Sequence, residues 1–238
     1  MDLSVYKTFA DEKLGVEFKE LELLVTAFTH RSYVNEHKKT VKEHNERLEF
    51  LGDAVLELVV TQYLYGNFDD PEGVLTNWRS ALVRTESIGA AAARLEFEPL
   101  LRLSRGEKRG TTRARAQILA NAFEAVIGAI YLDQGYDAAK VFIEKNLLIT
   151  FESILKSGSW MDPKSHLQEV IQSQEGHTPQ YKVLEEVGPD HEKIFTVGVF
   201  VTGELRGKGT GPSKQTAQVA AAEAALKNSG LSPANAEA

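Results

Sequence analysis

The stretch His44-Asn45-Glu46-Arg47-Leu48-Glu49-Phe50-Leu51-Gly52-Asp53 carries most of the information about the fold and chemistry of this chain. Its acidic residues Glu46, Glu49 and Asp53 are spaced i, i+3 and i+7, which places three carboxylates on one face of a helix. Such a stack repels itself unless solvent or a divalent cation compensates, and Mg²⁺ takes carboxylate oxygens as ligands. The spacing alone fits two structures: a solvated acidic face, which Glu57 would extend, or a magnesium site.

One further carboxylate, that of Glu124, lies alone in an apolar segment. Between residues 118 and 132 the only formal charge is Glu124. A helix that is apolar nearly all round is expected to be buried, and a buried carboxylate needs a partner. That partner is either an arginine or a metal ion shared with the acidic face, to which Asn121 would add an oxygen one turn earlier. The residues alone leave both open, and the candidate arginines are Arg47, Arg79 and Arg84.

The composition of the chain excludes or disfavours several classes of protein. The chain has 238 residues, with 34 acidic against 27 basic, a net charge of −7 and no cysteine. Without cysteine there is no disulfide and no thiolate zinc site. A net acidic chain argues at first sight against a nucleic-acid partner. The first residues show no secretory signal and no apolar run is long enough to span a bilayer, so we expect no membrane partner and a cytoplasmic location.

The pattern of apolar residues changes once along the chain. Up to about residue 153 it is helical, including a face formed by Leu48, Leu51, Val55 and Leu58 and a helix around Leu82, Ile88 and Leu95. After a short stretch rich in Gly, Ser and Pro, it predicts a helix at 165–174, strands at 181–187, 194–201 and 205–209, and a helix at 213–226. We therefore expect an all-α domain at 1–156, a linker at 157–163, a small α+β domain of order α-β-β-β-α at 164–230 and a disordered tail at 231–238.

At this point the chain resembles a known family. Residues 45–53 are similar, without a break, to the signature motif of ribonuclease III, and residues 29–33, 79–83, 106–107 and 118–125 look like supporting motifs. The α-β-β-β-α region resembles a double-stranded-RNA-binding domain. The resemblance covers nearly the whole chain. It implies an all-α endonuclease domain that forms a homodimer through the segment around Phe50, followed by the RNA-binding domain.

The resemblance also implies an active site. Most relatives carry Asp where this chain has Asn121, which keeps a ligating oxygen but loses a negative charge, so Mg²⁺ should be held less strongly. The implied cofactor is Mg²⁺, with Mn²⁺ as a substitute and no small-molecule cofactor. The implied catalytic residues are Asp53 and Glu124, the implied metal ligands are Glu49, Asp53, Asn121 and Glu124, and further acidic residues of the cleft are Glu46 and Glu72.

The reaction implied by the resemblance is hydrolysis of phosphodiesters in double-stranded RNA. Paired divalent ions can activate water and stabilise the leaving oxygen without a side-chain nucleophile. The products would carry 5′-phosphate and 3′-hydroxyl ends, and two sites in a dimer would leave a short 3′ overhang. Processing of ribosomal RNA and of other structured or messenger RNA precursors is the usual role in the family.

Double-stranded RNA is recognised mainly through its shape, by contacts to the minor groove and to phosphates. The resemblance assigns Ser165, Gln168, Glu169 and Gln172 to a minor-groove helix, His191 to a second minor-groove contact and Lys214 to phosphate. Relatives usually carry two or three basic residues where this chain has Lys214-Gln215-Thr216, so we expect weaker binding and a shallower salt dependence, partly compensated by Lys208. In the first domain, the cluster Lys108, Arg109, Arg113 and Arg115 is predicted to face phosphates.

Three hypotheses follow from the sequence. The chain is an active Mg²⁺-dependent endoribonuclease, a double-stranded-RNA-binding protein with weak or no cleavage because of Asn121, or a helical scaffold with an attached interaction module. Only the first explains both the acidic helix face and the lone Glu124, and it is the one we favour.

Overall fold

The computed structural model describes residues 3–158, 160–189 and 192–229, which form two compact units, Met1–Glu152 and Ser153–Ala238. The predicted linker 157–163 falls between the end of one helix at Ser157 and the start of the next at Pro163. The predicted tail at 231–238 lies outside the described residues. No helix in the described ranges is long and apolar enough to cross a membrane.

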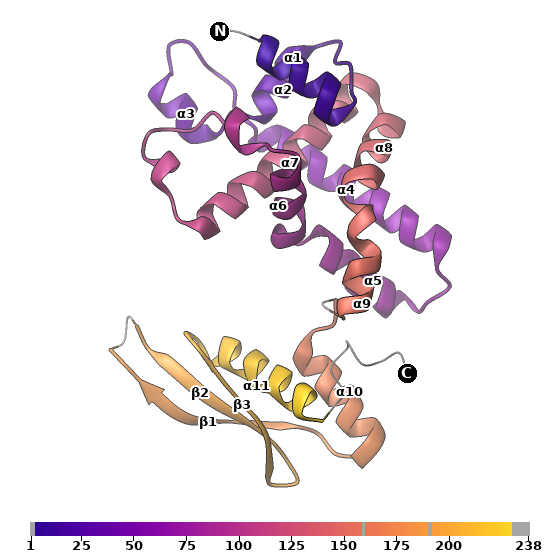
Figure 1. Ribbon diagram of the computed structural model, residues 1–238, viewed down its shortest axis with the longest axis vertical. Helices are drawn as coiled ribbons and strands as arrows, with labels where there is room; N and C mark the ends of the chain where they lie inside the picture. The colour runs from indigo at the N-terminus through magenta and orange to yellow at the C-terminus, as the bar shows by residue number, and fades with distance from the viewer. Residues whose placement is uncertain (1–2, 159, 190–191, 230–238) are drawn as a thin grey trace. The chain divides into compact units, whose positions relative to one another are not determined.

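The first unit is helical, as expected (Figure 1). Its helices are α1 (Ser4–Phe9), α2 (Leu21–Ala27), α3 (Arg31–Glu36), α4 (Glu46–Asn67), α5 (Glu72–Val83), α6 (Thr85–Arg94), α7 (Thr112–Gln134) and α8 (Tyr136–Asn146), and α9 (Phe151–Ser157) begins at its end. Short π or 3₁₀ turns cover Ala10–Leu14, Glu98–Leu100, Glu107–Arg109 and Leu148–Thr150. Gly135, with φ of 89°, separates α7 from α8 at the predicted stop.

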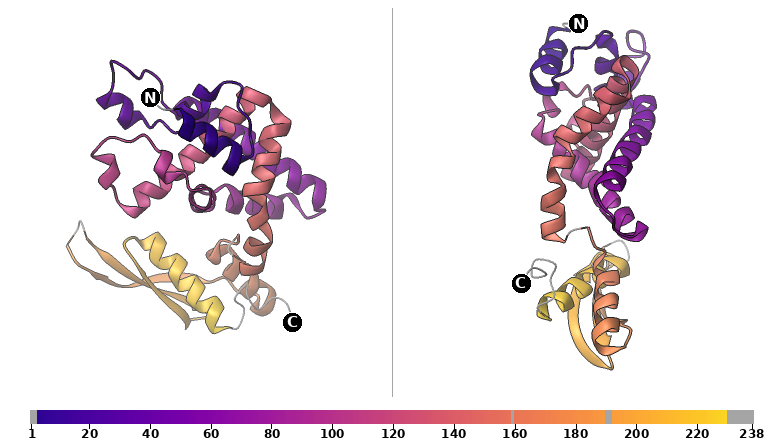
Figure 2. Two further views of the ribbon diagram at one scale, coloured as in Figure 1. Left: turned by 45° about the horizontal axis from the view of Figure 1, so that its top comes forward. Right: turned by 90° about the vertical axis from the view of Figure 1, so that its right-hand side faces the viewer.

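Helix α7 is the core of this unit and confirms the prediction of a buried apolar helix. Between residues 118 and 130, every side chain is buried except Asn121 and Glu124. Helices α4 and α6 pack along its sides, and α4 lies beside it in both views of Figure 2. The two partly exposed polar residues of α7 are therefore the two that the sequence singled out.

Two details of the predicted helices are wrong. Leu58 is 58% exposed and does not share the buried face of Leu48 and Val55. The reason is that α4 contacts α7 through Gly52, which turns the helix so that Leu56, Val59 and Val60 face inward instead. The apolar residues at 82–95 belong to two helices, because the extended Arg84 (ψ 151°) ends α5 and starts α6.

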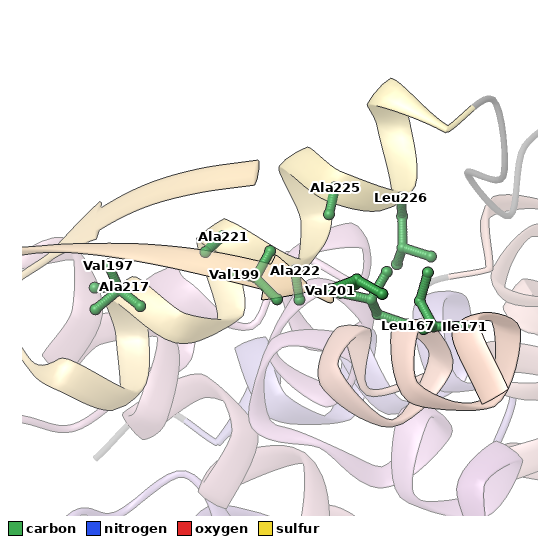
Figure 3. Close-up of a cluster of buried hydrophobic side chains, with 10 residues drawn as sticks. All are labelled: Leu167, Ile171, Val197, Val199, Val201, Ala217, Ala221, Ala222, Ala225 and Leu226. Carbon is green, nitrogen blue, oxygen red and sulfur yellow. The ribbon is translucent and has the colours of Figure 1, made fainter. Parts of the chain in front are cut away.

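The second unit has the predicted α-β-β-β-α order: α10 (Pro163–Glu175), β1 (Gln180–Val187), β2 (Ile194–Val201), β3 (Glu204–Gly211) and α11 (Lys214–Asn228). The strands form an antiparallel sheet in the order β1-β2-β3, and both helices contribute to the core on one face of it. Val197, Val199 and Val201 point into this core, as the alternation predicted (Figure 3). They meet Leu167 and Ile171 of α10 and the alanine-rich face of α11, formed by Ala217, Ala221, Ala222, Ala225 and Leu226.

Candidate functional site

Two glycines bring the acidic residues of α4 and α7 together. A Cβ at Gly52 would lie 1.7 Å from the backbone oxygen of Glu124, and a Cβ at Gly128 would lie 2.3 Å from the backbone oxygen of Leu48. Only glycine permits so close an approach of the two backbones. Because Gly52 stands between Glu49 and Asp53, the crossing point of the helices sets both carboxylates beside Glu124.

The electrostatics of these carboxylates confirm that they lie near one another. Burial, together with the smaller effects of the negative charges of Asp53 and Glu49, raises the pKa of Glu124 to about 8. Burial also raises the pKa of Glu49, with Glu46 and Asp53 adding to the rise. The neighbouring carboxylates therefore oppose the ionisation of Glu49 and of Glu124, as expected of a site that lacks positive charge.

No arginine in the described part of the chain supplies a positive charge to these carboxylates. Within the described ranges, Glu49, Asp53 and Glu124 form no ion pair with Lys, Arg or His. Arg79, one of the candidate partners, instead contacts Glu57, with 3.0 Å between Nε and Oε2. The structure thus removes the arginine alternative for Glu124 and leaves the metal alternative.

Asn121 belongs to the same group of side chains. Its amide donates a hydrogen bond to Glu49, which lowers the pKa of that carboxyl and opposes the effect of burial. Its Oδ1 accepts a hydrogen bond of 2.7 Å from Nε2 of Gln117. The amide oxygen that would bind a metal is therefore held by Gln117 in this structure.

The two further acidic residues have different surroundings. Glu46 adjoins Glu49 and pairs with Arg31 at 3.4 Å and with His44 at 3.8 Å. Glu72 accepts a hydrogen bond of 3.1 Å from Thr76 and lines a separate pocket that includes Thr61. Because Thr61 is eight residues after Asp53 in α4, that pocket starts about 12 Å further along the helix axis. Within one protomer the structure does not bring Glu72 to the other carboxylates, and its role in the cleft stays a prediction.

The donor chemistry of the cluster fits Mg²⁺. In the part of the chain that is described, no three His, Cys, Asp or Glu side chains are arranged as a ready-made metal cage. Mg²⁺ does not require one, since it keeps several waters and binds through one or two carboxylates. The uncompensated carboxylates Glu49, Asp53 and Glu124 are suited to such an ion, with Asn121 as a neutral fourth donor.

The residues expected to bind RNA lie in the second unit. Ser165, Gln168, Glu169 and Gln172 are all exposed on α10. Ser165 and Gln168 line a polar pocket together with Gln215 of α11, and the Ser165 hydroxyl donates to Asp162 at 2.9 Å. Their contacts with RNA stay predictions, and His191 lies outside the described residues.

Several basic residues that the sequence assigned to RNA phosphate form ion pairs within the protein or lie on another face. Lys214 begins α11 and is exposed, but Glu186 of β1 lies 3.1 Å from its Nζ. Lys208 pairs in register with Gly198, between the inward-facing Val197 and Val199, so it lies on the sheet face opposite α11 and does not reinforce Lys214. In the first unit, Arg115 contacts Glu98 at 3.3 Å, whereas Lys108, Arg109 and Arg113 are exposed.

Comparison with known proteins agrees with both units. Residues 20–151 match the model of the Ribonuclease-III-like family, and residues 163–229 match the double-stranded RNA binding motif. The chain is 46% identical over 218 residues to Ribonuclease 3 of Enterococcus faecalis. This match covers 91% of this chain and 94% of that protein. It is 43% identical over 228 residues to Ribonuclease 3 of Pelotomaculum thermopropionicum, which covers 95% of each.

A solved structure shows the same fold for the first unit. The nuclease domain of ribonuclease III from Campylobacter jejuni matches with a TM-score of 0.52 and 42% identity, over 58% of this chain and 96% of that one. That structure was described for its flexibility in a region involved in dimer formation.

A helical domain with clustered carboxylates, followed by an α-β-β-β-α module, defines the class of ribonuclease-III-like proteins that carry a double-stranded-RNA-binding motif. The relatives match this layout along nearly their whole length. The chain belongs to the ribonuclease III family, which confirms the prediction made from residues 45–53 and from the order of the second domain.

Proposed function

We propose that this chain is a Mg²⁺-dependent endoribonuclease that cuts double-stranded RNA at the cluster formed by Glu49, Asp53, Asn121 and Glu124. Its family makes it an endoribonuclease specific for double-stranded RNA. The observation that carries the metal proposal is that Glu49, Asp53 and Glu124 lie together without a paired cationic side chain in the described residues. Burial, followed by the charges of Asp53 and Glu49, raises the pKa of Glu124 to about 8. A divalent cation is the partner that such a site is missing.

The carboxylates have distinct parts in this proposal. Bound Mg²⁺ supplies activation of the attacking water and stabilisation of the leaving 3′ oxygen. Glu124 and Asp53 would provide the two carboxylates on which catalysis depends, and a bound cation would favour the ionised form of Glu124. Glu49 and Asn121 complete the donor set, and Glu46 and Glu72 add negative charge to the cleft. Mn²⁺ prefers the same oxygen donors and is expected to substitute.

The rest of the proposal follows the domain layout. We infer an endonuclease domain at 1–156, a linker at 157–163 and an RNA-binding domain at 164–230 that holds the duplex through α10 and Lys214. Phe50 is 82% exposed beside a cavity lined by Leu23, Leu51 and Leu132, which supports packing against a second copy. Two sites in a homodimer would cut both strands and leave a short 3′ overhang. The expected substrates are ribosomal and other structured RNA precursors in the cytoplasm.

One observation favours a second candidate, a protein that binds double-stranded RNA with little cleavage. Asn121 carries no charge and its Oδ1 is held by Gln117 at 2.7 Å, so one donor of the metal site is weak. Under this candidate the RNA-binding residues act as proposed and the cluster holds Mg²⁺ too weakly for reaction.

The direct test is to incubate the protein with a long RNA duplex and with either of its single strands. We expect Mg²⁺-dependent cleavage of the duplex only, with 5′-phosphate and 3′-hydroxyl product ends and no reaction in chelator. Binding of the duplex without cleavage in Mg²⁺ or Mn²⁺ would establish the second candidate instead.

A further inference from the structure

Lys214, the only basic residue in the first turn of α11, is engaged within the protein. Its Nζ lies 3.1 Å from Oε1 of Glu186 and 5.5 Å from the centre of the Phe195 ring. Glu186 also lies 3.9 Å from Nζ of Lys193. The cation expected to contact RNA phosphate is therefore already paired with a carboxylate.

A β-bulge determines that Glu186 is the residue that pairs with Lys214. Val183 pairs with Val197 on the core face of the sheet, and strict alternation would put Glu185 on that face next. The register shifts between Val183 and Glu185, so that Glu186 pairs with Phe195 instead. The extra residue reverses the alternation and turns Glu186 toward the start of α11, while Glu185 points to the other face.

We infer that Glu186 is an internal competitor of the RNA phosphate for Lys214 and so sets the affinity of this domain for double-stranded RNA. The inference rests on the proposed function, because it requires that the start of α11 contacts the duplex. A carboxylate and a phosphate oxygen offer the same charge-assisted hydrogen bond to an ammonium group. Binding RNA therefore requires Lys214 to exchange one anion for another, which cancels much of its contribution.

The competition has a measurable consequence because Lys214 has no basic neighbour in its turn. Both partners are partly exposed, with 57% of the Lys214 side chain and 39% of the Glu186 side chain accessible. An exposed pair of this kind is worth up to about 1 kcal/mol, so its removal should tighten binding by up to about fivefold. Lys214 would then contact phosphate without competition, which should steepen the salt dependence of binding by up to about one unit.

The test compares the variants Glu186→Gln and Glu185→Gln in the full chain. Both remove one negative charge from neighbouring residues of β1, but of these two residues only Glu186 forms an ion pair with Lys214. Affinity for an RNA duplex is measured in chelator, which prevents cleavage, over a series of salt concentrations. Each substitution is repeated with Lys214→Met, and thermal unfolding is recorded to compare the folding of the variants.

We expect Glu186→Gln to bind the duplex more tightly and with a steeper salt dependence than Glu185→Gln, and the difference to disappear with Lys214→Met. Equal effects of the two substitutions, or an advantage of Glu186→Gln that persists with Lys214→Met, would overturn the inference. If no version of the chain binds the duplex, the proposed function itself fails, and the inference fails with it.

Discussion

At the scale of single residues, the surroundings of Glu124 change its pKa most clearly. Its pKa is raised from 4.5 to about 8 by burial and by Asp53 and Glu49. Between these pH values the folded protein holds a proton that the unfolded chain has released. The free energy of unfolding therefore falls as the pH rises through this window, and the stabilisation is fully present only below the unfolded value.

This gives a prediction for stability without metal. In chelator, the melting temperature of the wild type should fall as the pH rises from 4.5 to about 8, relative to Glu124→Gln, whose side chain does not titrate. Thermal unfolding followed by circular dichroism over that range measures the difference. Parallel pH profiles for the two proteins would show that Glu124 is not perturbed as described.

Asn121 gives a second prediction at this scale. The substitution Asn121→Asp adds a negative charge beside Glu49 and Glu124 and a stronger oxygen donor for a metal. The Mg²⁺ concentration needed for half-maximal cleavage should fall, and in chelator the pKa of Glu49 should rise further. A Mg²⁺ titration of cleavage by both proteins measures the first effect, and an unchanged requirement would contradict this account of Asn121.

The sequence was a good guide to these residues, within limits that the structure explains. Spacing placed Glu49 and Asp53 on one face, and the isolation of Glu124 marked it as unusual. The sequence could not decide whether the partner of Glu124 is an arginine or a metal ion. The structure was needed for this, because it shows that Arg79 pairs with Glu57. The role of Glu186 was missed, since it depends on a bulge near Leu184 that no residue in β1 signals.

At the scale of elements, the crossing of α4 and α7 builds the site. Counting apolar residues placed Leu58 inside, but the closest contact is made by a residue without a side chain, Gly52. Hydrophobic periodicity does not detect such contacts, because glycine counts as neither apolar nor polar in the pattern. For the same reason the sequence predicted both helices and the carboxylates on them, but not how closely the two backbones approach.

The crossing can be tested by Gly52→Ala with Gly66→Ala as a matched control in the same helix. A Cβ at Gly52 would overlap the backbone of Glu124, whereas a Cβ at Gly66 has no atom within 4 Å. We expect Gly52→Ala to destabilise the protein by about 1–3 kcal/mol or more and to abolish cleavage. Gly66→Ala should stabilise it by about 0.5–1 kcal/mol. Chemical denaturation measures both, and similar effects of the two substitutions would contradict the described packing.

At the scale of the whole molecule, the proposed dimer depends on Phe50. Its side chain and that of Tyr65 are both 82% exposed aromatic groups on α4, but only Phe50 adjoins the cavity that includes Leu23 and Leu132. We expect Phe50→Ala to weaken self-association and Tyr65→Ala to leave it unchanged. Sedimentation velocity over a range of protein concentrations measures the effect. A wild-type chain that remains monomeric, or equal behaviour of the two variants, would contradict the proposed interface.

The net charge of the whole molecule no longer argues against an RNA partner once the positions of the charges are known. The net charge of −7 argued against nucleic acid, yet part of it belongs to the cluster of Glu49, Asp53 and Glu124, which we propose binds Mg²⁺. In the second domain, Lys214, which we propose contacts RNA phosphate, is paired with Glu186. The net charge of the whole chain therefore describes neither the carboxylate cluster nor the surface proposed to contact RNA.

The central claim is that the carboxylate cluster is a Mg²⁺ site that cleaves double-stranded RNA. The most direct measurement compares Glu124→Gln with Glu57→Gln, which removes the same charge from an acidic residue that pairs with Arg79 outside the cluster. Cleavage of a duplex is followed across a Mg²⁺ titration, with duplex affinity measured in chelator. We predict that Glu124→Gln loses cleavage by at least about 100-fold while keeping its affinity, and that Glu57→Gln cleaves like the wild type. Cleavage by Glu124→Gln at the wild-type rate and Mg²⁺ requirement would contradict the claim.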